Sequence, residues 1–246
     1  MDSVRDFGSG IMTTLRNNPF RKICLATFLV FNAFQVIAAF SWFIIVYYMN
    51  AGDPVAAGVW PTLFGSVGAL FTCFLVIPVI NWCAQTYGKL NTFMVSQAVS
   101  LLGYIFLWWG FSPENPWMMF IPLPLFSFGI GGLFTIMMSM TADICDMDEL
   151  ETGERREGTF GAIYWWMVKF GAAVAGAGSG LILSVIGFDQ TVAIQSDETL
   201  SMLRLSYVLI PCIGTSIAIF VMRNYDLDEQ KANEIRAQLD ARAAAK

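Results

Sequence analysis

The chain has 246 residues, of which 56% are hydrophobic and only 13% are charged. Soluble domains carry about 25% charged residues, so this composition excludes an ordinary water-soluble domain and predicts an integral membrane protein. The net charge of −5 argues against nucleic-acid binding, which needs a basic face. The chain has no histidine and five scattered cysteines without a CxxC pair, so we expect no metal site and no bound cofactor.

Six apolar stretches are each long enough to cross the hydrocarbon core of a bilayer, about 30 Å, as a helix. We expect these spans at 22–49, 58–83, 91–112, 117–145, 158–187 and 199–222. Together they form a predicted transmembrane domain over 22–222, with a cytoplasmic lead-in over 1–21 and a cytoplasmic helical tail over 223–246. The lead-in lacks the apolar core of a secretory signal, so the first span itself should direct insertion.

The distribution of basic residues predicts the orientation of the spans. Twelve of the fourteen lysines and arginines lie in the N-terminal stretch up to Lys22, the second and fourth connections and the tail. The first, third and fifth connections contain none. Because basic connections stay in the cytoplasm, we expect a multi-pass protein of the cell membrane, embedded in the lipid bilayer, with both termini cytoplasmic.

Two side-chain amides interrupt the first span. Asn32 and Gln35 lie three residues apart and therefore near each other on one helix face. Polar amides in a membrane span face the interior of the helix bundle, where they can bind a substrate or hold neighbouring helices together. Both interpretations stay open for this pair.

Acidic and basic residues gather between the fourth and fifth spans. Asp143 and Asp146 share a helix face at the cytoplasmic end of the fourth span, and Arg155 and Arg156 follow. Charge pairs among such groups can hold neighbouring helices closed, which predicts a cytoplasmic gate; a static, solvated turn is the alternative. The candidate gate residues are Asp143, Asp146, Glu149, Thr152, Arg155, Arg156 and Glu157.

The fifth span contains a lysine that cannot easily reach water. Lys169 lies about 17 Å from the cytoplasmic start of its span, at 1.5 Å per residue. A charge at this depth is costly unless it faces protein or water, so Lys169 is a functional candidate. Trp165 and Trp166 precede it by four and three residues and offer a flat surface for a sugar ring, with membrane-interface aromatics as the alternative. The other cation within a span, Arg204, lies near the outer end of the sixth span, where its side chain can reach the interface.

These features resemble the glycoside–pentoside–hexuronide cation symporters, a melibiose permease-like branch of the major facilitator superfamily. That family carries an A-D-x-x-D-x-x-E/D-x-x-T-G-x-R-x-E-G pattern between its tenth and eleventh helices. Here the pattern is matched by Ala142, Asp143, Asp146, Glu149, Thr152, Gly153, Arg155, Glu157 and Gly158. The Gly88-Lys89 pair, Lys169 and the tail from Tyr225 to Arg242 also resemble that family.

The resemblance implies an all-α membrane fold of six transmembrane helices, matching the C-terminal half of a major facilitator transporter with inverted three-helix repeats. It implies sugar or sugar-acid symport by alternating access, coupled to Na⁺ or H⁺, and no enzymatic activity. It places Lys169 near the shared cation and sugar sites. The alternative function is a non-transporting membrane scaffold or sensor.

Carboxylates that could bind a coupling ion are missing from the middle of the six spans. In the resembled family these carboxylates belong to the N-terminal six helices. We therefore expect a second six-helix membrane subunit that supplies them. A heterodimer ranks above a homodimer, because a homodimer would place two Lys169 ammonium groups across one cavity without a balancing charge. A piece of a longer protein is the third possibility, against which the lead-in after Met1 argues weakly.

Overall fold

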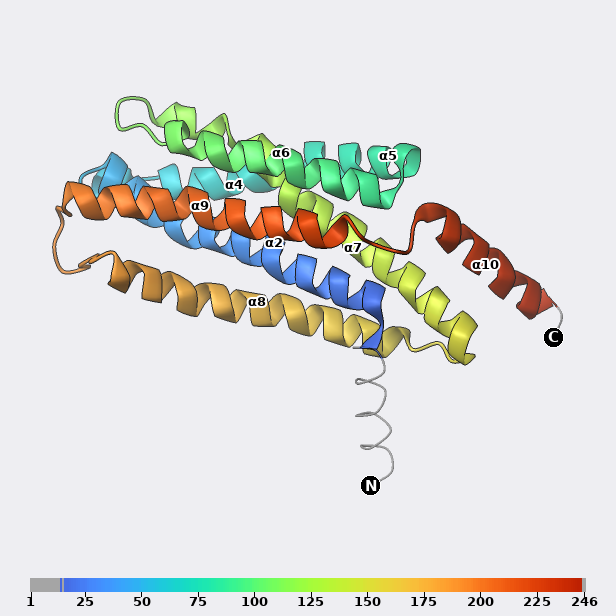
Figure 1. The fold of residues 1–246 in the computed structure, drawn as a ribbon. Helices are drawn as coiled ribbons and strands as arrows, with labels where there is room; N and C mark the ends of the chain where they lie inside the picture. Colours follow the sequence, from blue (N-terminus) through green and yellow to red (C-terminus); the bar gives the residue numbers. More distant parts are fainter. Residues whose placement is uncertain (1–13, 15, 245–246) are drawn as a thin grey trace, which may run out of the picture.

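The computed structural model describes residues 14 and 16–244, and all regular structure in them is helical (Figure 1). Six helical segments are long and apolar enough to cross a membrane, which agrees with the predicted fold class. Most of the predicted lead-in, residues 1–13 and 15, lies outside the described residues, as do 245 and 246. The six segments are Asn18–Met49, Pro54–Tyr87, Lys89–Gly110, Pro116–Thr152, Glu157–Val185 and Asp197–Met222.

The first segment is α2 (Asn18–Phe43), which continues into a π-helical stretch, η1 (Ile44–Met49). It begins at Asn18 rather than at the predicted residue 22, because Asn17 caps it by accepting a hydrogen bond from the Phe20 backbone N–H at 3.0 Å. A proline in the first turn suits this position, since its missing N–H would have no partner there.

The second segment is interrupted and the third is continuous. A π-helical stretch, η2, separates α4 from α5 within the second segment, and π-helical turns are often found at functional sites. The elements are α3 (Pro54–Ala57), α4 (Trp60–Phe71), η2 (Thr72–Val76), α5 (Ile77–Tyr87) and α6 (Lys89–Gly110).

The fourth segment consists of a short 3₁₀ helix, η3 (Pro116–Phe120), and the long helix α7 (Leu123–Thr152). Helix α7 continues for two turns past residue 145, the predicted end of the apolar span. It stops where Gly153 adopts a left-handed conformation with φ of +76° and donates its N–H to the Glu149 carbonyl at 2.9 Å. Asp148, Glu149 and Glu151, which follow the predicted end of the span, therefore also lie on α7.

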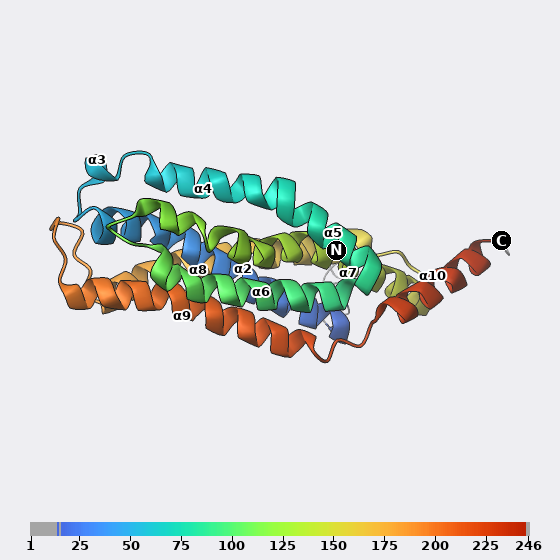
Figure 2. The same cartoon turned by 90° about the horizontal axis from the view of Figure 1, so that it is seen from above.

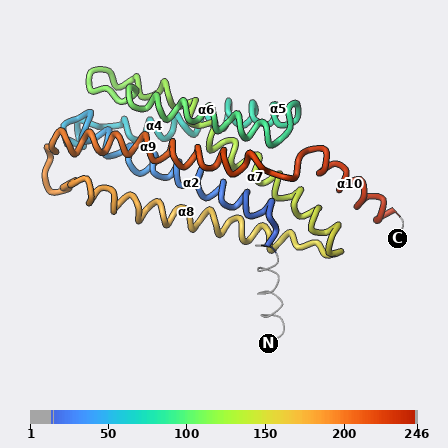
Figure 3. Tube along the Cα trace, viewed as in Figure 1, coloured from blue at the N-terminus to red at the C-terminus, as the bar shows by residue number. Residues whose placement is uncertain are grey.

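The remaining helices are α8 (Glu157–Val185), α9 (Asp197–Met222) and α10 (Glu229–Ala244). The tail forms the predicted helix, α10, which has no buried residue and extends beyond the bundle (Figure 3). We call the end of the bundle that carries the start of α2, the α5–α6 turn, the α7–α8 turn and α10 the basic end.

Helix α2 runs along α9 and α8, while α6 packs against α7 and α9 (Figure 2). The approach of α6 to α7 requires glycine at one point. A Cβ atom on Gly103 would lie 2.3 Å from the Phe126 backbone nitrogen, so any larger residue would force the two helices apart.

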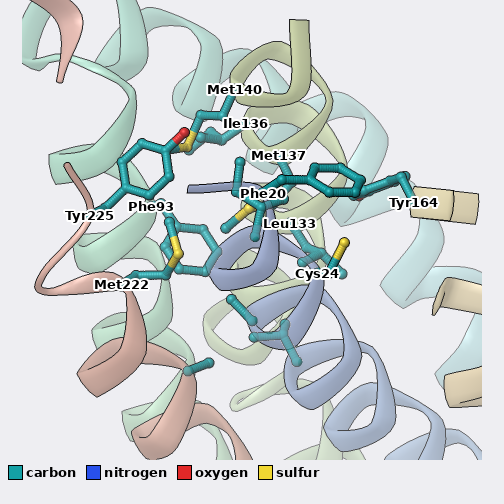
Figure 4. Packing of buried hydrophobic residues seen from close by; sticks show 14 of the residues in the cluster. Phe20, Cys24, Phe93, Leu133, Ile136, Met137, Met140, Tyr164, Met222 and Tyr225 are labelled. Atoms are coloured by element: carbon teal, nitrogen blue, oxygen red, sulfur yellow. The ribbon is translucent and has the colours of Figure 1, made fainter. Parts of the chain in front are cut away.

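Two apolar clusters hold the bundle together. At the basic end, side chains from α2, α6, α7, α8 and α9 meet in one core, which includes Phe20, Phe93, Met137, Tyr164 and Met222 (Figure 4). The second core lies toward the opposite end and includes Phe40, Tyr104, Leu123, Leu203 and Tyr207. Each core draws on helices distant in sequence, which fixes the order of the helices around the bundle.

The helices differ in how much of their surface the chain covers. In its most apolar stretch, the fourth segment has 61% of its residues buried, against 17% in the second and 28% in the fifth and sixth. Helix α7 is therefore central, whereas α4–α5, α8 and α9 each keep a wide uncovered face.

Candidate functional site

The first group of charges at the basic end is centred on Asp143 of α7. Its carboxylate is almost fully buried and accepts a bond from Lys89 Nζ at 2.5 Å. Arg236 of α10 approaches the same carboxylate at 3.4 Å. Because Lys89 begins α6, these two cations and one anion join three separate helices.

Arg155, in the turn between α7 and α8, gathers three further carboxylates. Its Nη1 lies 3.1 Å from Asp146 Oδ1 and 2.8 Å from Glu149 Oε2. Its Nε lies 3.1 Å from Glu157 Oε2, at the start of α8. Arg236 also approaches Asp146, at 3.5 Å, so the Arg155 group is joined to the Asp143 group through α10.

Arg156 pairs with a residue that the sequence analysis did not select. Its guanidinium donates two hydrogen bonds to Asp148, one of them from Nε to Oδ2 at 2.8 Å. Asp148 is buried, with 7% of its side chain exposed, and lies on a different face of α7 from Asp143. Thr152, a predicted gate residue, donates to the Asp148 backbone carbonyl at 2.7 Å and forms no bond to either arginine.

Both arginines stay charged throughout the physiological pH range. Hydrogen bonds to Glu149 and Asp146 raise the pKa of Arg155, and the hydrogen bonds to Asp148 raise the pKa of Arg156. Deprotonation of an arginine therefore cannot release these pairs. They can separate by protonation of the carboxylates, by rotation of the side chains or by movement of α7 relative to α8.

Helix α10 has no buried residue, but it contacts the rest of the basic end through polar groups. Arg236 approaches Asp143 of α7, Arg242 Nη1 donates to the Leu150 carbonyl at 2.8 Å, and the Lys89 backbone N–H donates to Glu229 at 3.2 Å. Arg236 and Asp143 are far apart in the sequence, so their contact could not be predicted from it.

On α8, the three predicted substrate residues all lie on the uncovered part of the helix. Trp165 and Trp166 are 44% and 59% exposed, and Lys169 is also exposed. Trp165 stacks on Phe134 of α7 with ring centroids 6.2 Å apart, whereas Trp166 stacks on Phe170 of its own helix at 5.1 Å. Among residues 14 and 16–244, Lys169 forms neither a hydrogen bond nor an ion pair.

The two amides of α2 behave differently from each other. Asn32 Nδ2 donates to the Phe28 carbonyl of its own helix at 2.7 Å and sits where a Cβ on Gly171 of α8 would be 2.9 Å away. Asn32 therefore packs against α8 at Gly171, two residues after Lys169. Gln35 is half-buried and forms no side-chain hydrogen bond within the described part of the chain.

A groove with a volume of about 600 Å³ opens beside these residues, between α2, α4, η2 and α7. Trp42 and Phe34 of α2 line one wall, and Phe134 of α7 lines another. Phe134 also stacks on Trp165. The groove therefore adjoins the tryptophan and lysine face of α8, a continuity that the sequence analysis did not find.

The described residues contain no group of three His, Cys, Asp or Glu that could hold a metal ion. The Lys169 ammonium can donate hydrogen bonds to a carboxylate or to sugar hydroxyls, but it cannot ligate a cation. The arrangement therefore favours binding of a polar or anionic organic group on α8.

Comparisons with known proteins agree with the resemblance drawn from the sequence. Residues 5–229 match the family described as MFS/sugar transport protein. The glucuronide carrier protein homolog of Escherichia coli K12 is 26% identical over 94% of this chain and 49% of its own length. The isoprimeverose transporter of Lactiplantibacillus pentosus is 28% identical over 66% of this chain and 34% of its own length. A putative sulfoquinovose importer of E. coli K12 is 27% identical over 92% of this chain and 47% of its own length.

The chain thus spans about half the length of the curated relatives it matches most fully. These relatives are named as a carrier, a transporter and an importer, which confirms the expectation of a non-enzymatic protein. The family match covers most of the chain, including all six membrane segments. The chain therefore belongs to the MFS/sugar transport protein family and resembles its glycoside–pentoside–hexuronide symporters.

Proposed function

We propose that the chain is one half of a secondary active transporter that carries a sugar or sugar acid by cation-coupled symport. Substrate would bind between this six-helix unit and a second one, and the two units would rock to open the site alternately to each side of the membrane. The coupling ion, Na⁺ or H⁺, would be bound mainly by the second unit.

The observation that carries this proposal is the exposed Lys169 on α8. An ammonium deep in a membrane span is costly unless water or a counter-charge faces it. In the described chain no carboxylate pairs with Lys169, while Trp165, one helical turn away, offers an aromatic ring. A wet crevice that receives a sugar acid, or a carboxylate from a second unit, would satisfy this charge.

The uncovered faces of α4–α5 and α8 support the need for a second unit. A six-helix half exposes the wall of its cavity unless another half covers it. We favour a different subunit over a second copy of this chain, because two copies would place two unbalanced Lys169 ammonium groups in one crevice. The length of the relatives, about twice the matched region, agrees with a two-unit assembly.

We assign the charge clusters of the basic end to a cytoplasmic gate, with both ends of the chain in the cytoplasm. The Asp143 and Arg155 groups link α6, α7, α8 and α10, so they would hold these helices in one arrangement until substrate binding shifts the equilibrium. The abundance of basic residues at this end supports the orientation.

The substrate class is inferred from the relatives and from Lys169. Glucuronide, isoprimeverose and sulfoquinovose, the compounds in the relatives' names, share a sugar ring, and sulfoquinovose and glucuronide are anionic. A cation beside two tryptophans suits an anionic sugar, and it also suits the hydroxyls of a neutral one.

Counterflow in membrane vesicles tests the proposal. Labelled glucuronic acid, isoprimeverose and sulfoquinovose would be offered to vesicles that contain the chain alone, and to vesicles that also contain a co-expressed candidate six-helix subunit. We expect exchange only with both units. Exchange of equal rate by the chain alone as a monomer would contradict the two-unit proposal. Absence of exchange with every partner and sugar would favour a scaffold or sensor.

A further inference from the structure

The groove between α2, α4, η2 and α7 has a chemical character of its own. None of its lining residues is charged, and it has no side-chain amide. Four hydroxyl side chains line it, from Ser41, Thr62, Thr72 and Ser127. The rest of the surface is aromatic, aliphatic or glycine, with one cysteine, Cys73.

Most of these hydroxyls already donate their proton inside the chain. Ser127 Oγ donates to the Leu123 carbonyl at 2.7 Å, and Thr72 Oγ1 donates to the Gly68 carbonyl at 2.8 Å. Ser41 Oγ donates to the Ile37 carbonyl at 2.5 Å and also bonds to the Tyr207 hydroxyl at 2.9 Å. The groove therefore offers few hydrogen bonds to a ligand.

A sugar ring is poorly suited to such a surface. Each hydroxyl moved from water into a site without a partner loses its hydrogen bonds at a cost of about 1–3 kcal/mol. An apolar ring gains from the same move, and the walls present the indole of Trp42, which is 42% exposed, and the ring of Phe34. The volume of about 600 Å³ would accept a ring of the size of a phenyl group with its substituents.

The groove lies next to the polar anchor. Phe134 forms part of its lining and stacks on Trp165, which precedes Lys169 by four residues, or one turn of α8. A molecule with a polar sugar at Lys169 could therefore extend its other end past Phe134 into the groove.

We infer that this groove binds the apolar aglycone of a glycoside whose sugar lies at Lys169. The inference rests on the proposed function and narrows its substrate class: the chain selects glycosides with an aromatic or other bulky apolar aglycone over the corresponding free sugars. Trp42 and Phe34 determine this selectivity, and Lys169 does not.

The cysteines of the chain provide a direct test, because two of them line different grooves. Cys73 is exposed in the groove described above, whereas Cys83 lines a separate apolar groove of about 240 Å³ between α5 and α6. Vesicles from cells that express the chain together with its native partners would be treated with N-ethylmaleimide. Mass spectrometry would follow the alkylation of each cysteine separately.

Three matched pairs of probes would be added: the 4-nitrophenyl β-glycosides of glucuronic acid, xylose and glucose, and the three free sugars. We expect one glycoside to slow alkylation of Cys73 by about tenfold at saturation, with Cys83 unchanged as the internal control. The matching free sugar should compete with that glycoside for uptake but should not protect Cys73 from alkylation. Equal protection by sugar and glycoside, or competition by both with no protection, would overturn the inference while leaving the transport proposal intact.

Two other outcomes are distinct. Cys73 that is unreactive in the assembled complex with or without ligand would show that a helix of the second unit fills the groove, which also overturns the inference. Failure of every compound to compete for uptake or protect Cys73 would count against the transport proposal itself.

A variant pair sharpens the test. Trp42→Ala should weaken binding of the protecting glycoside by about tenfold while changing affinity for its free sugar less than about twofold. Trp109→Ala removes a similarly exposed tryptophan from α6, outside the groove, and should change neither. Parallel losses for sugar and glycoside in Trp42→Ala would contradict a role confined to the aglycone.

Discussion

Lys169 and Arg204 lie within membrane segments and away from the basic end, and the fold treats these two cations in opposite ways. The Arg204 guanidinium lies between two aromatic rings, 4.2 Å from the centroid of Tyr48 and 4.4 Å from that of Trp108. Its Nη2 also donates to the Trp108 backbone carbonyl at 2.6 Å. Lys169 has no such partner anywhere in the described chain.

The comparison supports a structural role for Arg204 and the proposed functional role for Lys169. Arg204 of α9 finds its partners on η1 and α6, so the six-helix unit satisfies this charge without help. Lys169 has aromatic or aliphatic neighbours along α8, and no residue of the described chain bonds to its ammonium. A charge that the fold leaves unsatisfied at membrane depth needs a ligand or another polypeptide, and this need identifies the side of the bundle where transport should occur.

Replacement of Lys169 should have the largest effect on transport. In the assembled transporter, Lys169→Ile should lower sugar accumulation by about 100-fold, since removing one partner of a desolvated charge pair costs about 2–5 kcal/mol. The unfolding midpoint of the purified chain should stay the same, because Lys169 bonds to no described residue. Uptake of labelled sugar and denaturant unfolding would measure the two quantities.

The matched control for this change is Arg223→Gln, which removes one exposed cation at the end of α9 and should leave accumulation unaltered. Undiminished accumulation in Lys169→Ile would remove the main support for a functional role of this residue.

The reverse pattern is expected for Arg204. Arg204→Ala should destabilise the chain by about 2–4 kcal/mol, from two cation–π contacts and one charged hydrogen bond. Arg204→Lys should recover part of this loss, since an ammonium cannot make the same planar contact with both rings. Denaturant unfolding in detergent would measure the difference. A midpoint equal to that of the wild-type chain would show that the aromatic cage contributes nothing.

The six membrane helices could be predicted from the sequence. Only some of the contacts between charged side chains could. Hydropathy alone located six spans, because a membrane requires long apolar helices. It did not show that α7 continues past residue 145, where Met147, Glu149, Leu150 and Glu151 are good helix formers. The Lys89–Asp143–Arg236 contact and the groove at Trp42 depend on how distant helices pack, and spacing along the chain does not encode that packing.

The buried Arg156–Asp148 pair at the basic end tests whether a second charge that is paired inside the chain stabilises the fold, as we expect for Arg204. Asp148→Ala should destabilise the chain by about 1–3 kcal/mol, because it leaves the Arg156 guanidinium, 17% exposed, without its carboxylate. Glu151→Ala, on an exposed position of the same helix end, is the control and should have no measurable effect. Equal behaviour of the two variants would mean that the Arg156–Asp148 bonds are not formed in the membrane.

The smallest effect on stability is expected for an ion pair that is exposed to solvent. Asp226, beyond the end of α9, accepts a bond from Lys22 Nζ at 2.8 Å, but 62% of its side chain is exposed. The hydrogen bond and charge of Lys22 lower the pKa of Asp226 below its usual value of about 3.8. The contribution of this pair is therefore complete at neutral pH, and it is lost only as the pH falls through the lowered pKa.

Asp226→Asn should accordingly leave the unfolding midpoint at neutral pH unchanged within error, because solvent screens an exposed pair. Unfolding measured from pH 7 to pH 4 should give parallel curves for the variant and the wild-type chain. A clear loss of stability in Asp226→Asn at pH 7 would show that charge pairing alone, without burial, holds this bundle together. The contrast between Arg204 and Lys169 would then no longer identify which charge serves transport, since exposure would not predict the energetic role of a charge.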